Sequence, residues 1–150
     1  MNDKKQAGRD GDEAVANLLQ KAVDAFSRDA KEEFQRLVKA YEGSNAVVGI
    51  FGMGSVTIGV SGGKVRVGSA EKMGKTRFLG RGATYPETIV ALAEGRMTPL
   101  EAFHTGDIVV RAPSDELHKA YGLAVQMSDA AIRSKNLQGV LREFRAKANV

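Results

Sequence analysis

The fold of this chain is decided by residues 84–112, which read TYPETIVALAEGRMTPLEAFHTGDIVVRA. Pro86 suits the first turn of a helix, because its missing N–H would have no helical partner there, and Gly95 marks the end of that helix. The last residues, 107–111, alternate as an apolar strand. The stretch predicts two short helices that lead the chain into a strand, and it contains no recognisable catalytic motif.

The second of these helices has the stronger sequence signals. Thr98 and Pro99 combine an N-cap hydroxyl with an N1 proline, and Glu101 stands at capping-box spacing. Gly106 suits the left-handed position that ends a helix.

The residues before this stretch predict a helical segment followed by strands. Apolar residues recur at spacings of three and four over 12–42, and Asp29 with Glu32 has capping-box spacing that divides the segment into two helices. Gly62 and Gly63 form a two-residue hairpin signal. Strands are expected at 46–52, 56–60, 64–68 and, with a weaker pattern, 76–84, so that three or four of them form an antiparallel meander.

The residues after this stretch predict two more helices. Ser114 is expected to cap a long helix to about Arg133. Its segment 120–132 is apolar or small nearly all round, which predicts burial on more than one side. A last amphipathic helix must bury an apolar stripe against its own domain or a partner. The stripe consists of Leu137, Val140, Leu141 and Phe144.

Length and composition fit one globular domain. The 150 residues include no cysteine, which excludes disulfides and thiolate metal sites. The net charge of +4 is mild, and the lack of Trp with 6% aromatic residues argues against a base-stacking platform, so no nucleic acid partner is expected. No apolar run matches a membrane span. The polar start is not a secretory signal. We therefore expect a cytoplasmic protein.

These observations predict an α+β fold with a five-stranded, mostly antiparallel sheet that helices cover on one face. Residues 1–11 are expected to be a disordered lead-in, 12–133 the main domain and 134–150 a C-terminal amphipathic helix.

Candidate catalytic and cofactor motifs fail on spacing. SAEKMGKT (69–76) has Ser69 where a phosphate loop needs glycine, and a strand-like segment follows it instead of a helix. His104 and His118 have no partner at metal-ligand spacing. No cofactor, metal or enzymatic activity is expected.

Basic residues cluster between 64 and 81, with Glu71 the only acidic residue among them. They are either a solvated sheet face or a patch for lipid headgroups, a CoA phosphate or an acidic partner. Transient contact with an anionic membrane surface is assigned to Lys72, Lys75 and Arg77.

The segment EGRMTPLEAFHTGDIVVRA (94–112) resembles the signature of the sterol carrier protein 2 family, with Gly95, Pro99, Ala102, Gly106 and Ile108 at matching positions. The resemblance implies a sheet and helices around an apolar tunnel that binds fatty acids, acyl-CoA or sterols. The first and last helices are additional to that core.

The leading hypothesis is thus non-enzymatic binding or transfer of a lipid in an internal tunnel. Strand alternation and the resemblance nominate the tunnel-lining residues. These are Val48, Ile50, Val56, Ile58, Val60, Leu92, Phe103, Ile108, Val110, Leu123 and Met127. The alternative is an interaction or dimerisation module with a filled core, accessory to a lipid-metabolising enzyme. Small strand residues, among them Gly59 and Gly82, are compatible with either a cavity or tight packing.

Overall fold

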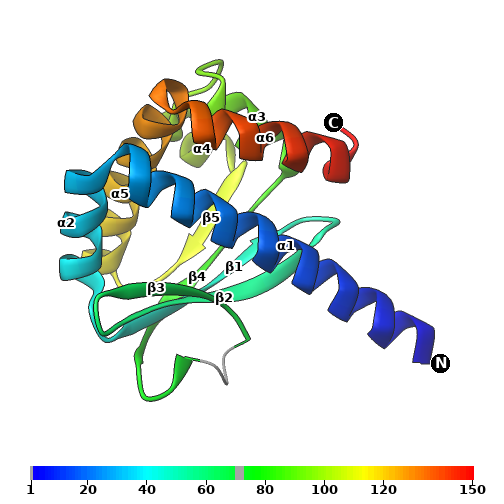
Figure 1. The fold of residues 1–150 in the computed structure, drawn as a ribbon, viewed down its shortest axis with the longest axis horizontal. Helices are drawn as coiled ribbons and strands as arrows, with labels where there is room; N and C mark the ends of the chain where they lie inside the picture. The colour runs from blue at the N-terminus through cyan, green and yellow to red at the C-terminus, as the bar shows by residue number, and fades with distance from the viewer. Residues whose placement is uncertain (1, 70–72) are drawn as a thin grey trace.

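Figure 1 shows the computed structural model, which describes residues 2–69 and 73–150. Helices and strands follow in an order that agrees with the sequence prediction. The elements are α1 (Asn2–Asp29), α2 (Lys31–Tyr41), β1 (Ser44–Ile50), β2 (Gly54–Ser61), β3 (Lys64–Gly68), β4 (Arg77–Thr84), α3 (Pro86–Ala93), α4 (Pro99–Thr105), β5 (Ile108–Arg111), α5 (Ser114–Arg133) and α6 (Lys135–Ala148).

The strands form one five-stranded sheet in the order β3-β2-β1-β4-β5. The predicted α+β class and mostly antiparallel sheet are confirmed. Strands β1, β2 and β3 form the antiparallel meander, but β4 does not extend it, because β4 pairs with β1 in parallel instead of with β3. Alternation within a strand is the same for either direction of pairing, so the sequence did not show this. The amide of Arg77 donates to the carbonyl of Gly43 at 2.7 Å and starts the parallel register.

The β2–β3 hairpin has the turn that its two glycines predict. Gly62 and Gly63 have φ of 61° and 76°, a left-handed pair that a two-residue hairpin requires and that glycine adopts without steric cost. The Glu42 carboxylate accepts hydrogen bonds from both amides, at 2.6 and 3.2 Å. This contact ties the end of α2 to the hairpin.

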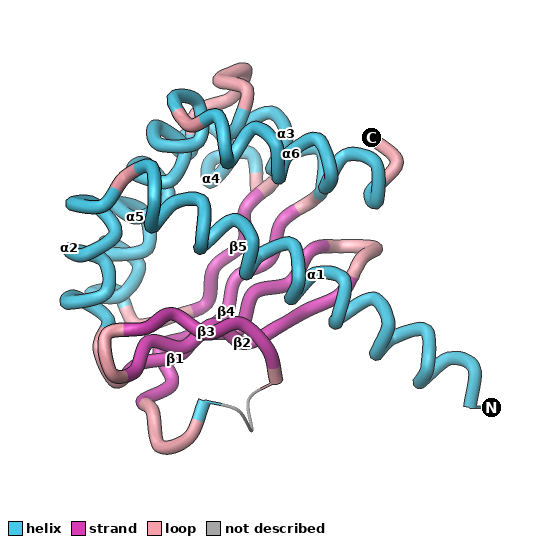
Figure 2. The backbone as a smooth tube through the Cα atoms, in the orientation of Figure 1, coloured by secondary structure: helices cyan, strands magenta, loops and turns pink. Residues whose placement is uncertain are grey.

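Helices α1 to α6 form a layer on one face of the sheet, and none of these six helices lies over the other face (Figure 2). Because side chains alternate along a strand, each strand sends every second residue to the helices. We call the two sides the helix-covered face and the open face.

Two of the predicted helix caps differ from the structure. The α1–α2 break falls at Ala30, which caps α2 without a side-chain hydrogen bond, so the expected Asp29 cap is wrong. Pro113 is the N-cap of α5, and Ser114 is already helical. The Thr98 cap of α4 is confirmed, since its hydroxyl accepts from the Glu101 amide at 3.2 Å. Gly106 is left-handed at the C-cap, with φ of 78°.

The last two helices are buried differently from the sequence expectation. In α5 only Ala130 is buried, so burial on more than one side is wrong. Tyr121, Val125 and Ile132 stay exposed. In α6, by contrast, Leu141 and Phe144 are buried inside the domain.

The buried residues form two separate clusters that share α1. The first joins α1, α3 and α6 to strands β1 and β2, and consists of Val15, Leu18, Ile50, Val56, Val90, Leu141 and Phe144. The second lies among the helices and consists of Ala25, Phe26, Ala130 and Leu137. A domain usually has one contiguous core. The apolar residues that belong to neither cluster are therefore candidates for lining a ligand site.

Candidate ligand-binding site

The register places the nominated strand residues on the helix-covered face. Val48 pairs with Val56 on one side and with Gly82 on the other, and Gly82 pairs in turn with Val110. A second row crosses the sheet from Ile50 through Thr84 to Ile108, and Ile58 and Val60 continue the same face along β2. Their contact with a ligand stays a prediction.

One end of this face is filled by side chains. Ile50 and Val56 are 5% and 6% exposed and pack in the first cluster against α1 and α6. Ile58 packs at the edge of the same cluster. A ligand at this end would have to displace core side chains, so these residues would close the site.

The middle of the face is less filled. Val48, Ile108 and Val110 are half-buried and belong to neither cluster, and Val60 is buried but also outside both. Gly82 removes side-chain volume beside them, since a Cβ there would lie 3.7 Å from a Val110 methyl. The wall of an apolar binding site consists of apolar side chains that are not packed into a core cluster. These residues beside Gly82 meet that requirement.

The nominated helix residues do not all meet at one place. Met127 packs at the edge of the second cluster, whereas Leu92 and Leu123 are half-buried outside both. Phe103 packs against Tyr121 with ring centroids 5.8 Å apart and the rings tilted by 59°, and this contact joins α4 to α5.

Further residues with the same character were not nominated from the sequence. Phe34 and Leu37 of α2 pack at the edge of the second cluster, and Val65 and Val67 of β3 pair with Val60 and Ile58 on the helix-covered face. The three-and-four spacing of α2 and the alternation of β3 were the signals that could have identified them.

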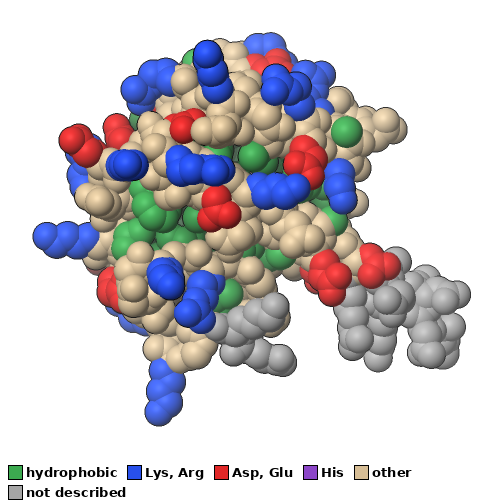
Figure 3. Space-filling view, viewed as in Figure 1, with side chains coloured by type: hydrophobic (Ala, Val, Ile, Leu, Met, Phe, Trp, Pro, Cys, Tyr) green, Lys and Arg blue, Asp and Glu red, His purple; other side chains and the backbone are tan. Residues whose placement is uncertain are grey.

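Hydrophobic side chains gather in a hollow bounded by α1, α2 and β3 in the space-filling view (Figure 3). Basic side chains project around it. No residue of α2 is fully buried, although its apolar side faces the domain. The hollow therefore lies at the β3 edge of the helix-covered face.

Charged and polar side chains from α2, α5 and β4 lie close together around Glu116. The Glu116 carboxylate is 3.6 Å from the Arg77 guanidinium and 3.8 Å from the Lys119 ammonium. Burial, and then the charge of Glu116, raise the pKa of the Tyr41 phenol. Arg77 is thus paired with Glu116 here. Lys75 is exposed, and Lys72 lies outside the described residues.

Two further depressions lie on the surface. One of about 390 Å³ is lined by the β1–β2 turn with Gly49, Ala83 and Asp12, and Ile50 is the only nominated residue in its wall. The other, of about 540 Å³, has charged walls that include Asp29, Glu33 and Arg133. Neither coincides with the predicted lipid site.

The described residues contain no group of three His, Asp or Glu side chains that could hold a metal ion. His104 and His118 are both exposed, on different helices. Within the same residues no helix combines the length and apolar character needed to cross a membrane.

Comparison with known proteins shows similarity at the level of structure. No protein-family model matches the sequence, and no curated protein matches it. The structure titled "UbiJ-SCP2 Ubiquinone synthesis protein" matches with a TM-score of 0.53 at 14% identity, over 80% of this chain and 94% of that chain. A sterol carrier protein domain 2 of Helicoverpa armigera matches with a TM-score of 0.50 at 18% identity, over 71% of this chain and 81% of that chain. The chain therefore has the fold of sterol carrier protein 2 domains, as the resemblance of residues 94–112 implied.

Proposed function

We propose that this chain binds a lipid-class ligand between its sheet and its helix layer, without catalysing a reaction on it. The observation that carries the proposal is the apolar hollow of Figure 3, at the edge of a sheet face whose central valines belong to neither core cluster. The sterol carrier title of one structural neighbour supports a lipid as the ligand class.

The helix layer supports the same proposal. The α5 helix packs loosely, with Ala130 its only buried residue, so a ligand beneath it would add apolar contacts that the free protein lacks. Each methylene buried contributes about 0.8 kcal/mol, which is about a fourfold gain in affinity. Affinity should rise with acyl chain length and level off when the site is full.

Displacement of a fluorescent fatty acid tests the proposal directly. Leu123→Asp places a charge on the inner side of α5 and should weaken binding at least tenfold. Val125→Asp changes the same helix at a residue that is 41% exposed, and should leave binding unchanged. Circular dichroism checks that both variants fold. No displacement by any acyl chain length, or equal losses in the two variants, would overturn the proposal.

A second candidate function, a protein-interaction module, is favoured by the exposed apolar residues of α5. Leu117, Tyr121 and Val125 recur every four residues and form one stripe on the helix. Light scattering distinguishes this candidate, because Val125→Asp would then lower the measured mass while ligand displacement stayed as in the unmodified chain.

A further inference from the structure

The open face of the sheet has an unusual composition. Its basic side chains are Lys64, Arg66, Arg81 and Arg111, and its exposed or half-buried apolar ones include Val47, Phe78 and Val109. None of the five strands contains an aspartate or glutamate. The face is therefore cationic and partly apolar, with no acidic strand residue to neutralise it.

Two arginines lie directly opposite each other on this face. Arg81 of β4 pairs with Arg111 of β5 in the antiparallel register, and neither forms an ion pair with a described residue. Like charges in opposing positions destabilise a sheet. An anion above the pair would remove this repulsion.

A bulge brings an aromatic side chain to the same place. Phe78 pairs with Asn45 and Gly80 pairs with Ala46, so Leu79 is the extra residue in β4. The bulge puts Phe78 on the open face, where it is 52% exposed, with the Arg81 guanidinium 5.9 Å from its ring centroid.

A second aromatic group lies where β1 and β4 end. Phe51 and Tyr85 follow these strands and stack with ring centroids 4.7 Å apart, and both stay more than two-fifths exposed. Exposed aromatic rings beside basic residues suit the headgroup region of a bilayer.

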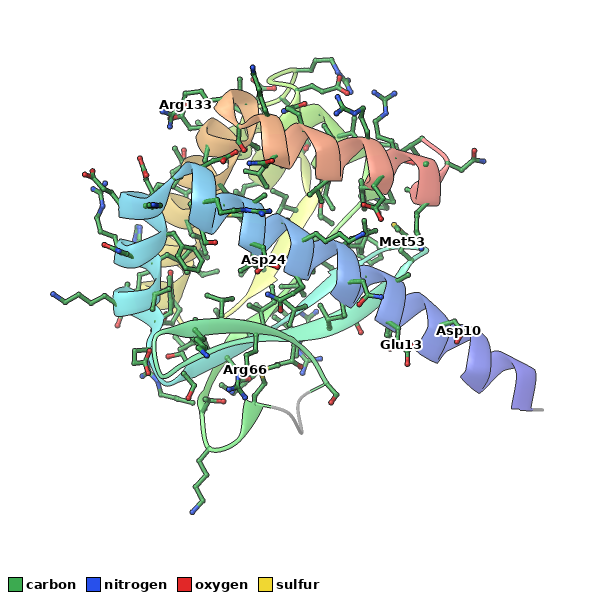
Figure 4. All side chains as sticks on the ribbon, in the orientation of Figure 1. Asp10, Glu13, Asp24, Met53, Arg66 and Arg133 are labelled. Carbon is green, nitrogen blue, oxygen red and sulfur yellow. The ribbon has the colours of Figure 1, made fainter. Side chains whose placement is uncertain are left out.

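Little of the described protein covers this face. Helices α1 to α6 lie on the other side, and Arg66 points away from α1 (Figure 4). Of the segment after β3, Met73 packs over Gly59, and Thr76 accepts a hydrogen bond from Asn45 at 2.7 Å. These contacts cover the open face at Gly59 of β2 and Asn45 of β1. They leave Arg81, Arg111 and Phe78 uncovered.

We propose that the open face docks on an anionic membrane surface, with Arg81 and Arg111 against lipid headgroups and Phe78 inserted at the interface. Nucleic acid suits the face less well, because a base-stacking platform needs several rings on the sheet surface, and Phe78 is the only aromatic residue within the five strands. The proposal does not depend on a ligand inside the domain, so it can fail or succeed separately from lipid binding there.

Vesicle co-sedimentation of the full chain tests the charge contribution. Phosphatidylcholine vesicles with phosphatidylserine should bind the chain, and those without it should not. Each basic residue contributes roughly a fivefold gain in affinity, so Arg81→Gln with Arg111→Gln should weaken binding about 25-fold. Arg28→Gln with Arg142→Gln removes the same charge from the helix layer and should have little effect. An equal loss in both pairs, or tighter binding to single-stranded DNA than to vesicles, would overturn the proposal.

Fluorescence tests the insertion of Phe78. The chain has no Trp, so Phe78→Trp introduces a single reporter. Its emission should shift to the blue on addition of anionic vesicles. Leu100→Trp, on α4 and similarly exposed at 51%, is the matched control and should not shift. A shift in both variants or in neither would contradict docking through the open face.

Discussion

Asp29, the last residue of α1, accepts a hydrogen bond from the hydroxyl of Ser134, the residue that separates α5 from α6. The same carboxylate accepts from the Asn136 side-chain amide at 2.8 Å. Ser134 in turn accepts from the Leu137 amide at 3.0 Å and caps α6. One carboxylate thus fixes the position of α6 relative to α1, at the edge of the second core cluster.

Removing the cap should destabilise the protein measurably. Ser134 is 5% exposed, and Ser134→Ala deletes both the cap of α6 and the donor to Asp29. We expect the free energy of unfolding to fall by about 1–2 kcal/mol. Urea titration followed by circular dichroism measures it. Ser61→Ala, at an exposed strand end, is the control, and a loss of the same size there would contradict the role of the cap.

Low pH should remove the contribution of Asp29 to the stability of the folded protein. Hydrogen bonds from Ser134 and then Asn136 hold the pKa of Asp29 below its ordinary value of 3.8. A carboxyl whose pKa is depressed by folding stabilises the protein above its unfolded pKa, and the stabilisation is lost as the pH falls through the folded pKa. The stability difference from Asp29→Asn should be constant above pH 3.8 and shrink below it. Thermal melts across this range check the sign, and a difference independent of pH would refute it.

Truncation of α6 side chains should lower stability without changing the mass of the protein. Phe144 is 5% exposed and packs in the first cluster with Val15 and Leu18. Phe144→Ala should cost about 3–5 kcal/mol, the usual range for deleting a buried aromatic ring. Urea unfolding gives this loss, and light scattering gives the mass. A lower mass with little loss of stability would instead make the stripe an oligomer contact.

Replacing each of two glycines by alanine should change the stability of the protein in opposite directions. A Cβ at Gly80 would lie 2.7 Å from the Ala112 Cβ and also clash with the Arg111 carbonyl, so Gly80→Ala should cost about 1–3 kcal/mol. Gly122 lies within α5 with nothing within 4 Å, so Gly122→Ala should stabilise by about 0.5–1 kcal/mol. Differential scanning calorimetry of the pair tests this, and a change of the same sign in both would be the contrary outcome.

Local signals predicted the elements of the fold well. The glycine pair of the β2–β3 turn, the Thr98 cap and the alternation of each strand depend on neighbouring residues, and the structure confirms all three. The partner of β4 depends on where the chain goes after Gly68, and no local pattern encodes that. The cap on α6 likewise uses Asp29, 105 residues before Ser134 in the sequence.

The sequence predicted which face of the sheet each candidate residue lies on, but not whether the residue lines a space or fills the core. Alternation predicted which strand residues share a face, and the register places Val48, Val56 and Val110 together. Whether a residue lines a space or fills a core depends on the helix above it. Val56 lies under α1 and α6, and Val110 does not, because distant segments pack over only one of them.

The pairing of α1 with α6 also has a consequence for synthesis. The apolar side of α1, with Val15 and Leu18, is covered partly by Leu141 and Phe144. A ribosome makes the chain from the N-terminus, and more than a hundred residues are synthesised between the end of α1 at Asp29 and the start of α6 at Lys135. Until α6 emerges, the strands and α3 can pack on α1, but the part of its apolar side that Leu141 and Phe144 cover lacks that cover. We therefore expect the nascent chain to aggregate less once α6 has left the ribosome and packed on α1.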